Sequence, residues 1–512
     1  MNIMMLLEMA NATFPERIAF VDGTNDSRIT YAALFNAAAN RASELRGSNF
    51  KRLGMLDVSS LATPVGLFSA AWAGVPFVPM NYRLTETEIQ ALVARITPTY
   101  LVTDSDHAAA LDAQADVTSL SREQFLAAAQ ADEDQTSDTD ATPWRMDPED
   151  TAVLLFTSGT TGTPKAAVLR HKHLVSYILT SVEFASADET EAALVCVPPY
   201  HIAGIMAVLS SVYAGRRVVQ LANFDAKRWL ELAAAEQITT AFVVPTMLAR
   251  IVEALEGKTQ ANLPALKSIA YGGGKMPLAV IERAMALFPR TDFTNAYGLT
   301  ETSSTIAVLG PNDHRQAMAS DDPAIRRRLV SVGQPLPGIE IDIRDSTGAV
   351  VNSGERGEIY VRGEQVSGEY EGRGSVTDSE GWFPTRDAGS IDEGGYLFLE
   401  GRADDVIVRG GENLSPGEIE DQLLAHPYVR DVAIVGVPSE QWGEAVAAAI
   451  VIDAGQAQAT QATADELRLW VKAQLRSSRV PQVIEFWDEL PYNETGKLLR
   501  RVVRERLAPA AL

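Results

Sequence analysis

The sequence predicts an α/β protein, and three observations along its 512 residues support that prediction. Between about residues 30 and 170, short apolar runs alternate with alanine-rich helical stretches, which is typical of largely parallel sheets covered by helices. Beyond Gly333, strands with frequent glycines replace this pattern, and the residues after about 404 mix strands with helices. We therefore expect a large N-terminal domain of stacked α/β sheets with a β-rich subdomain, followed by a small α+β C-terminal domain.

Composition excludes several classes of protein. With 46% hydrophobic and 22% charged residues, the chain can bury a large core, so a disordered or fibrous protein is excluded. The formal charge of −23 repels nucleic acid and anionic lipid, and we expect neither as a partner. The single cysteine, Cys196, allows no internal disulfide and no cysteine metal cluster, which favours the cytoplasm.

The N-terminal part begins with a helix in this interpretation. Residues 1–8 are apolar but lack Lys and Arg and include Glu8, so they do not fit a signal peptide. Helix is expected over 31–45, and strand over 100–103 and 153–156. Residues 61–80 contain three prolines, which indicates a buried helix followed by a strand and argues against a membrane span. The Asp-, Gln-, Ser- and Thr-rich stretch 129–150 is expected to be a solvated connection.

Later elements are predicted from shorter signals. Strands are expected over 339–343, 357–363, 431–437 and 445–452. Ser415 and Glu418 have the spacing of a capping box with Pro416 at the first helical position, and Thr463 and Glu466 have that of a second. Placing the boundary near residues 401–405 gives domains 1–403 and 404–512.

A glycine-rich loop follows the predicted strand 153–156. Residues 157–165 read TSGTTGTPK, and glycines, hydroxyl groups and a lysine suit phosphate binding better than a plain surface turn. Pro164 precedes Lys165 and Ala166 follows it, so the loop is not that of a P-loop NTPase. The triplet 272–274 does not form a G-x-G-x-x-G motif and is weak evidence alone.

Further motifs follow in a fixed order: NAYGLTE at 295–301, Gly357 with Glu358, Asp387, GRADD at 401–405 and LPYNETGK at 490–497. Together with the loop they resemble the adenylate-forming superfamily of acyl-CoA synthetases, luciferases and peptide-synthetase adenylation domains, over almost the whole chain. The resemblance implies a ligase that converts a carboxylic acid and ATP to an acyl-adenylate and pyrophosphate. CoA then gives acyl-CoA and AMP, with Mg²⁺ required.

The resemblance also implies residue roles in the first half-reaction. The loop would cover the β- and γ-phosphates, the Tyr297 ring would lie against adenine, and Asp387 would bind the ribose. In isolation Tyr297 would be core and Asp387 a surface residue. The implied ATP- or AMP-binding residues are Thr157, Ser158, Gly159, Thr160, Thr161, Gly162, Thr163, Lys165, Gly272, Gly273, Gly274, Asn295, Ala296, Tyr297, Gly298, Asp387 and Arg402.

Catalysis is implied for four residues. Thr300 would contact the α-phosphate, Glu301 would bind Mg²⁺, and His201 would contact the acid's carboxylate. Lys497, which by default would be a solvent-exposed lysine, would stabilise the attacking carboxylate and the α-phosphate electrostatically.

The second half-reaction is implied to need movement of the C-terminal domain. Asp404 stands at the family's hinge position, about which residues 404–512 would swing. Gly410, Gly411 and Glu412 would border the pantetheine channel. Trp442 and Arg479 would hold the CoA nucleotide, although a tryptophan in this setting more often serves packing.

The acyl pocket is implied by a motif around residues 198–204. Ile202 stands where amino-acid-activating relatives carry an acidic residue, so an amino acid is not expected. Small residues favour a medium-to-bulky apolar acid, fatty, aryl or cyclic, over acetate. The implied pocket residues are His201, Ile202, Ala203, Ala296, Ser303 and Ser304. Two departures from the family pattern are Ala166 and Arg386, both at positions usually occupied by glycine.

Several alternatives stay open at this point. The chain could load a carrier-protein phosphopantetheine, oxidise an acyl-adenylate as luciferases do, or be a catalytically idle nucleotide-binding regulator. Lys497 argues against the regulator, and the absence of a Walker loop argues against a simple ATPase. His171 and His173 are expected in a helix after the loop and not in a metal site. Monomer and homodimer are both open.

Overall fold

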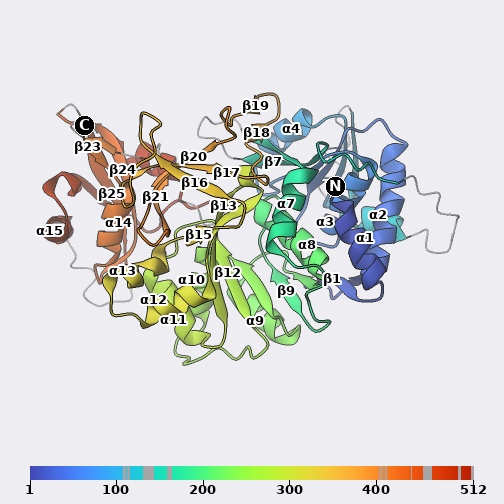
Figure 1. The fold of residues 1–512 in the computed structure, drawn as a ribbon, viewed down its shortest axis with the longest axis horizontal. Helices are drawn as coiled ribbons and strands as arrows, with labels where there is room; N and C mark the ends of the chain where they lie inside the picture. The colour runs from blue at the N-terminus through green and yellow to red at the C-terminus, as the bar shows by residue number, and fades with distance from the viewer. Residues whose placement is uncertain are drawn as a thin grey trace. The chain divides into compact units, whose positions relative to one another are not determined.

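The computed structural model describes residues 1–105, 107, 111, 116–130, 143–157, 164–402, 405, 407–409, 412–439, 441–453, 464–493 and 498–508. Contacts divide the chain into two units (Figure 1). Unit 1 comprises residues 1–329, 335–340 and 362–383, and unit 2 comprises 330–334, 341–361 and 384–512. The predicted domains 1–403 and 404–512 stay a prediction.

The first large sheet has nine strands, and its central strands run parallel. Antiparallel pairs flank this parallel core, β1 with β2 and β13 with β14. In spatial order the strands are β15 (Gln334–Pro335), β14 (Ser304–Leu309), β13 (Asp292–Leu299), β12 (Ser268–Gly272), β11 (Thr240–Val243), β9 (Ala192–Val195), β10 (Arg217–Gln220), β1 (Ile18–Asp22) and β2 (Arg28–Thr30).

The second large sheet has eight strands. It is parallel from β7 to β6 and antiparallel where β7 meets β8 and β8 meets β18. Its spatial order is β19 (Gly374–Ser375), β18 (Glu369–Tyr370), β8 (Lys165–Arg170), β7 (Thr151–Thr157), β4 (Phe77–Pro79), β3 (Arg52–Leu56), β5 (Thr99–Thr103) and β6 (Val117–Ser121). The antiparallel β7–β8 hairpin was not foreseen from the sequence.

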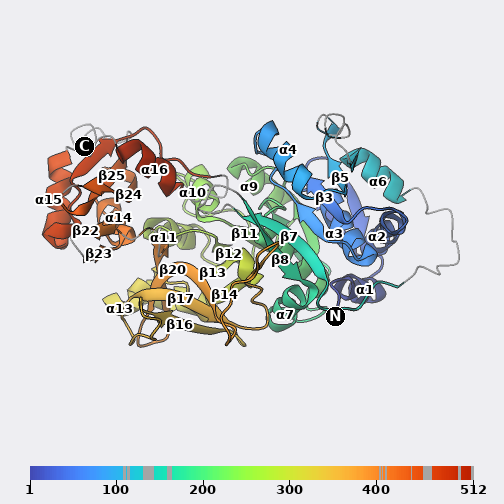
Figure 2. The ribbon, with the colours of Figure 1, turned by 90° about the horizontal axis from the view of Figure 1, so that it is seen from above.

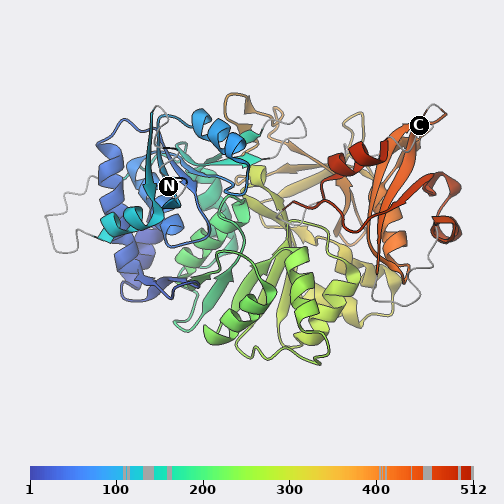
Figure 3. The same cartoon turned by 180° about the vertical axis from the view of Figure 1, so that it is seen from behind.

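Helices cover both sheets of unit 1, and a single core cluster joins them. Helix α3 is buried at every residue except Ala73, as expected for the proline-containing run. Figure 3 shows the helices in green, α9 and α10, from behind. The helices of unit 1 are α1 (Met4–Thr13), α2 (Tyr31–Arg46), α3 (Ala62–Ala73), α4 (Glu86–Arg95), α6 (Arg122–Gln130), α7 (His171–Ser181), α8 (Ile202–Ala214), α9 (Ala226–Ala235), α10 (Pro245–Ala254), α11 (Leu278–Leu287), α12 (Pro311–Ala319) and α13 (Pro323–Arg326), with short 3₁₀ turns η1 (Thr300–Thr302) and η2 (Arg327–Val330).

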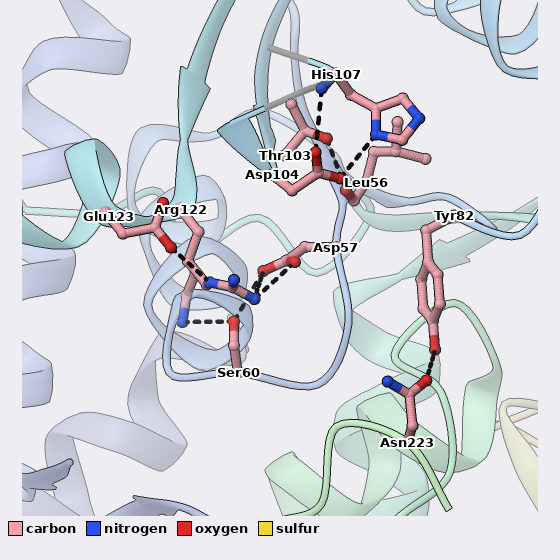
Figure 4. Close-up of polar contacts among 11 residues, drawn as sticks. Leu56, Asp57, Ser60, Tyr82, Thr103, Asp104, His107, Arg122, Glu123 and Asn223 are labelled. Carbon is pink, nitrogen blue, oxygen red and sulfur yellow. Dashed lines mark hydrogen bonds and ion pairs between the residues drawn. The ribbon is translucent and has the colours of Figure 1, made fainter. Parts of the chain in front are cut away.

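The carboxyl ends of the parallel strands in the second sheet carry polar side chains (Figure 4). Asp57, just after β3, is buried and accepts hydrogen bonds from Arg122 and Ser60, both at 3.0 Å. Burial raises the pKa of Asp57, and the Arg122 guanidinium acts against that rise. Asp104, after β5, accepts a hydrogen bond from the His107 ring at 2.7 Å. The Asp57–Arg122 pair links the end of β3 to the end of β6, while the Asp104–His107 contact stays local to the end of β5.

Unit 2 contains two smaller sheets. The four-stranded sheet has the order β16 (Glu340–Arg344), β17 (Gly357–Arg362), β20 (Phe383–Ile391) and β21 (Leu397–Arg402). The five-stranded sheet has the order β23 (Glu412–Leu414), β22 (Ile407–Arg409), β25 (Gly443–Ile452) and β24 (Val429–Ser439), with β26 (Val483–Phe486) on β25. The expected strands 339–343, 357–363, 431–437 and 445–452 are confirmed within two residues at their ends.

Alternating side chains of β24 and β25 form two cores, one on each face of the five-stranded sheet. Helices α14 (Pro416–Leu424) and α15 (Ala464–Gln474) cover one face, and α16 (Arg500–Leu507) covers the other. Figure 2 shows α14 and α16 on opposite sides of β24 and β25. The 3₁₀ turn η5 (Ser477–Arg479) follows α15.

The capping box predicted for α14 is wrong, although the helix begins where expected. Ser415 precedes the helix and Pro416 opens it, but the Ser415 hydroxyl donates to the Glu400 carbonyl at 3.1 Å. Glu418 instead pairs with Arg479 at 2.8 Å. Tertiary partners therefore replaced the local cap. Thr463, the start of the second predicted box, lies outside the described residues.

Among the described residues, none of the helices combines the length and the apolar character that crossing a membrane requires.

Candidate active site

The glycine-rich loop connects the two strands of the β7–β8 hairpin. Thr157 ends β7, Lys165 begins β8, and the two residues lie opposite each other in the antiparallel register. The Thr157 hydroxyl donates to the Lys165 carbonyl at 3.4 Å, so the two ends of the loop are held side by side. The predicted phosphate-binding residues between these ends lie outside the described residues: Ser158, Gly159, Thr160, Thr161, Gly162 and Thr163.

The turn after β13 carries Thr300 and Glu301. The Glu301 side chain is largely buried, and one carboxylate oxygen, Oε1, accepts a hydrogen bond from the Tyr370 hydroxyl at 2.6 Å. In the described part of the chain, no lysine or arginine forms an ion pair with Glu301. A buried carboxylate without a cation is costly, which favours a cationic ligand at this turn.

The donor set at this turn fits magnesium that arrives with a nucleotide. Mg²⁺ takes oxygen ligands, keeps several waters, and is usually held by one or two carboxylates together with substrate phosphates. Glu301 supplies one carboxylate and Thr300 a neighbouring hydroxyl. Within the described ranges no cluster of three His, Cys, Asp or Glu side chains could hold a resident metal ion.

Gly272 and β13 form the predicted adenine-binding wall. Strands β12 and β13 run parallel, with Gly272 opposite Ala296. A Cβ atom on Gly272 would lie 2.1 Å from the Ala296 carbonyl oxygen, so only glycine fits this close approach. Gly273 follows with a φ of +80°. Tyr297 is buried at 7% exposure, so only a small part of its ring can be offered to a ligand.

His201 occupies the N-cap position of α8 and is largely withdrawn from water. Its ring centroid lies 4.6 Å from that of Tyr200, which lies 5.5 Å from Tyr82. Burial lowers the pKa of His201 to about 4, and the charge of Arg83 acts in the same direction. His201 is therefore neutral at physiological pH.

The other predicted acyl-pocket residues lie on α8, on β13 and at the start of β14, and α8 contacts β14. Ala296 lies on β13, opposite Gly272. Ile202 and Ala203 open α8. Ser303 and Ser304 have φ angles of +53° and +97°, a region that non-glycine residues rarely adopt. Such strained residues cluster at functional sites, and here they follow Glu301 after one intervening residue, Thr302.

Asp387 and Arg402 are brought together in unit 2. They lie opposite each other on β20 and β21, and the Arg402 guanidinium donates to Asp387 at 2.9 Å. Arg386, the residue that departs from the family pattern, has a φ of +62°. Its side chain is 58% exposed and lies 3.8 Å from Glu358. The usual glycine suits this left-handed backbone, while the arginine side chain extends into solvent.

Three of the predicted CoA residues are described, Glu412, Trp442 and Arg479, and contacts link them to Arg409, which the sequence analysis missed. Trp442 is 42% exposed, and the Arg409 guanidinium lies 4.9 Å from the centre of its ring. Arg409 also donates to the Ser478 carbonyl at 2.9 Å, next to Arg479. Arg479 in turn pairs with Glu412 at 2.9 Å. Arg409 stands immediately before two glycines that were assigned to the CoA site, and this position could have indicated it from the sequence.

Four predicted residues of unit 2 lie outside the described residues: Asp404, Gly410, Gly411 and Lys497. The flanks of the lysine segment are described. Tyr492 and Leu498 form an antiparallel bridge across residues 493–497, and the N–H of Leu499 donates to the Pro491 carbonyl at 2.8 Å.

The predicted position of His171 and His173 after the loop is confirmed. Both lie in the first turn of α7, and burial lowers the pKa of each to about 4. Each Nδ1 atom accepts a backbone N–H at 3.3 Å, from Ile3 and Arg170 respectively. Both rings are therefore neutral structural acceptors.

Comparison with known proteins identifies the family. The model of the AMP-binding enzyme family matches residues 7–371, and that of the AMP-binding enzyme C-terminal domain matches residues 418–497. The chain therefore belongs to the AMP-binding enzyme family, which confirms the resemblance to the adenylate-forming superfamily.

Individual relatives support the same assignment. The chain is 33% identical over 453 residues to the fatty acid–[acyl-carrier-protein] ligase ScoC of Streptomyces coeruleorubidus, covering 86% of this chain and 83% of the relative. It is 30% identical over 489 residues to the feruloyl-CoA synthase of an Amycolatopsis species, covering 93% and 94%. Because both relatives are acid–thiol ligases, the predicted enzyme class is confirmed.

Solved structures share the fold across the chain. O-Succinylbenzoate CoA synthetase (MenE) of Bacillus subtilis, in complex with its acyl-adenylate intermediate, has a TM-score of 0.82 at 28% identity and covers 98% of this chain and 97% of its own. ATP-bound MatB of Rhodopseudomonas palustris has a TM-score of 0.86 at 27% identity and covers 100% of both chains. The predicted α/β fold class is thereby confirmed.

Proposed function

We propose that the protein is an ATP-dependent acyl-CoA synthetase that works through an acyl-adenylate. One arrangement within unit 1 supports this proposal most strongly. Glu301 is a buried carboxylate that forms no ion pair with the described lysines and arginines, and Lys165 stands at the end of the glycine-rich loop. Tyr370 contacts both residues. ATP with Mg²⁺ supplies the matching charges, because phosphates need the lysine and the cation needs the carboxylate.

In the first half-reaction a carboxylate oxygen of the acid attacks the α-phosphorus of ATP. The bond from that phosphorus to the β-phosphate bridging oxygen breaks, and pyrophosphate leaves with its electron pair. Lys165 and the loop before it hold the leaving phosphates, Thr300 contacts the α-phosphate, and Lys497 stabilises charge on the attacking carboxylate and α-phosphate. Bound Mg²⁺, held by Glu301, would neutralise phosphate charge.

In the second half-reaction the CoA thiol gives up its proton, and the sulfur attacks the acyl carbonyl carbon. The bond from that carbon to the phosphate oxygen of AMP breaks, and AMP leaves with its electron pair. We assign the CoA nucleotide to the patch of Trp442, Arg409 and Arg479, which offers an aromatic face and positive charge. Residues 404–512 would swing about Asp404 between the two half-reactions, so that Lys497 serves the first step and the patch serves the second.

Asp387 and Arg402 are assigned to the nucleotide ribose. A carboxylate can accept from both ribose hydroxyls, and the hydrogen bond from Arg402 at 2.9 Å fixes the orientation of the Asp387 side chain. On unit 1, adenine would lie against Tyr297 and the backbone of residues 272–274. The close packing of Gly272 on Ala296 supports a flat wall there.

The acid is proposed to be medium to bulky and apolar: fatty, aryl or cyclic. Ile202 offers no counter-ion for an ammonium group, and neutral His201 offers no charge to a polar tail. The names of the relatives cover such acids, including a feruloyl-CoA synthase and a long-chain fatty-acid–CoA ligase. We place the reaction in the cytoplasm, which the single buried cysteine supports.

A second candidate function is loading of a carrier-protein phosphopantetheine. It is favoured by one observation, the 33% identity to a fatty acid–[acyl-carrier-protein] ligase. Both functions share the first half-reaction and differ in the thiol that accepts the acyl group.

The test is mass spectrometry of the purified protein with ATP, Mg²⁺ and a panel of fatty, aryl and cyclic acids, with and without CoA. We expect acyl-CoA only when CoA is present, with AMP in equal amount. Acyl-adenylate that accumulates and does not react with CoA would favour the carrier-protein function. No product under either condition would contradict the enzyme and revive the nucleotide-binding regulator, and turnover restricted to two- or three-carbon acids would overturn the proposed acid class.

A further inference from the structure

Residues 365–370, a short segment of unit 1 distant in sequence from the turn after β13, hold that turn by both backbone and side-chain contacts. The carbonyl of Glu301 accepts hydrogen bonds from the N–H groups of Ser367 and Gly368, at 2.8 and 3.1 Å. The Gln365 side-chain amide donates to the carbonyls of Thr302 and Thr305, at 3.0 and 2.7 Å. The turn is therefore fixed by groups that no motif of the sequence includes.

The same segment also holds the strand that begins with Lys165. The Ser367 hydroxyl donates to the carbonyl of Val168, and Tyr370 pairs with Ala167 across β18 and β8. The Lys165 ammonium lies 5.5 Å from the centre of the Tyr370 ring. One side chain, Tyr370, thus contacts both the lysine and the carboxylate of the candidate site.

The two parts of the Tyr370 side chain have different effects. Its hydroxyl donates a hydrogen bond to Oε1 of Glu301 at 2.6 Å. This bond fixes the carboxylate rotamer and makes Oε1 less available than Oε2 to a metal ion. Its ring supplies a negative face to Lys165. Groups that hydrogen-bond to a metal-binding carboxylate orient it and tune its affinity.

We propose that Tyr370 is a positioning residue for magnesium–nucleotide binding, acting through Glu301. The hydroxyl holds one carboxylate oxygen so that the other faces the cation that arrives with ATP, and the ring keeps Lys165 beside the phosphates. This inference rests on the proposed function and adds a residue outside the predicted site.

The test is calorimetric titration of ATP into the protein without any acid, so that no turnover occurs. Each variant is titrated once with excess Mg²⁺ and once with EDTA, and the ratio of the two affinities gives the Mg²⁺-dependent gain. Tyr370→Phe removes only the hydroxyl. Tyr177→Phe is the matched control, because the Tyr177 hydroxyl donates at 3.4 Å to Thr305 on β14, the strand that follows the turn, and not to Glu301.

We expect the Mg²⁺-dependent gain in ATP affinity to be about tenfold smaller in Tyr370→Phe than in the wild type. The ATP affinity of this variant in EDTA should stay within about twofold of the wild type. Tyr177→Phe should keep the full gain. Glu301→Gln should lose the gain as well, and the double variant should lose no more than Glu301→Gln alone, because the hydroxyl acts through that carboxylate. Tyr370→Leu should in addition weaken ATP binding in EDTA, since Lys165 loses its ring.

Two outcomes would overturn the inference without touching the proposed function. Tyr370→Phe could keep the full Mg²⁺-dependent gain, or it could lose affinity equally with and without Mg²⁺, which would mean that the hydroxyl does not act through the metal ligand. Thermal melts of each variant show whether a loss reflects unfolding, and Tyr370→Phe retains the half-buried ring. A wild-type protein that binds no ATP at all would instead contradict the proposed function itself.

Discussion

The turn that carries Glu301 in unit 1 and the residues that flank 494–497 in unit 2 are stabilised in different ways. In unit 1 the contacts fall on the candidate residue itself, because both its carboxylate and its carbonyl accept hydrogen bonds from residues 367–370. In unit 2 the described contacts fall on the flanks of residues 494–497. The orientation of Glu301 is thus fixed by contacts within unit 1, whereas in unit 2 the described contacts hold Tyr492, Leu498 and Leu499 on either side of residues 494–497.

The main attachment in unit 2 is Arg500, three residues after Lys497. Its guanidinium donates to both carboxylate oxygens of Glu420, at 2.6 and 2.8 Å, and to the Ile434 carbonyl at 2.6 Å. Its Nε atom lies 3.5 Å from Asp405. A single arginine thus connects α16 with α14, β24 and the residue that follows the predicted hinge.

The largest expected effect comes from breaking this attachment. Arg500→Met leaves the buried Glu420 carboxylate without its cation, and we expect the free energy of unfolding to fall by about 3 to 5 kcal/mol. Arg501→Met is the matched control, because the Arg501–Glu505 pair is exposed and should change stability by less than about 1 kcal/mol. Urea unfolding measures both, and equal losses in the two variants would contradict the assignment.

A second variant breaks the turn in unit 1. A Cβ atom on Gly298 would lie 1.8 Å from the Ser304 carbonyl oxygen, so Gly298→Ala should cost about 3 kcal/mol and displace the residues around Glu301. Gly47→Ala is the control, because Gly47 lies outside the candidate site and its Cβ would lie 3.6 Å from the Ser43 carbonyl oxygen, an ordinary contact. Urea unfolding and ATP titration measure both. A stable Gly298→Ala with normal ATP affinity would show that the turn tolerates displacement.

Acid should weaken unit 1 through His171 and His173. Because burial lowers both pKa values to about 4, the unfolded chain takes up protons near pH 6.5 and the folded chain does not. The stability that the two neutral histidines contribute is therefore fully present above about pH 6.5 and is lost as pH falls towards 4. At pH 5.5 the loss in the free energy of unfolding is about 1.4 kcal/mol per histidine. The double variant His171→Asn/His173→Gln, compared with the wild type by urea unfolding at pH 7.5 and 5.5, should show a smaller loss. An unchanged loss would mean that other groups cause it.

The smallest expected effect concerns Arg386 in unit 2. Arg386→Gly relieves the left-handed backbone but makes the unfolded chain more flexible, so we expect a net gain of about 0.5 kcal/mol. Arg386→Ala keeps a Cβ at the same φ and should bring no gain, although it also removes the contact with Glu358. Thermal unfolding of the two variants compares their stabilities directly. If Arg386→Ala were stabilised as much as Arg386→Gly, backbone strain would be excluded as the cause.

The sequence predicted the fold class and most element positions because apolar periodicity and prolines act locally. The family resemblance assigned both Asp387 and Arg402 to the nucleotide. The structure places them opposite each other on β20 and β21, and their role stays a prediction. The sequence could not predict the contact of Tyr370 with Glu301, because 69 residues separate the two and only the fold of unit 1 brings them together. The cap at Ser415 failed for the same reason, since a distant carbonyl replaced the local partner.

We propose that this chain forms an acyl-adenylate and that Lys497 acts in that step alone. The most direct measurement follows Lys497→Ala by quenched mass spectrometry in two assays, adenylate formation from acid and ATP, and acyl-CoA formation from presynthesised acyl-adenylate and CoA. We expect adenylate formation to fall by about 100-fold or more, because a preformed charge is lost, while acyl-CoA formation from the adenylate stays close to that of the wild type. An equal loss in both assays would contradict the claim.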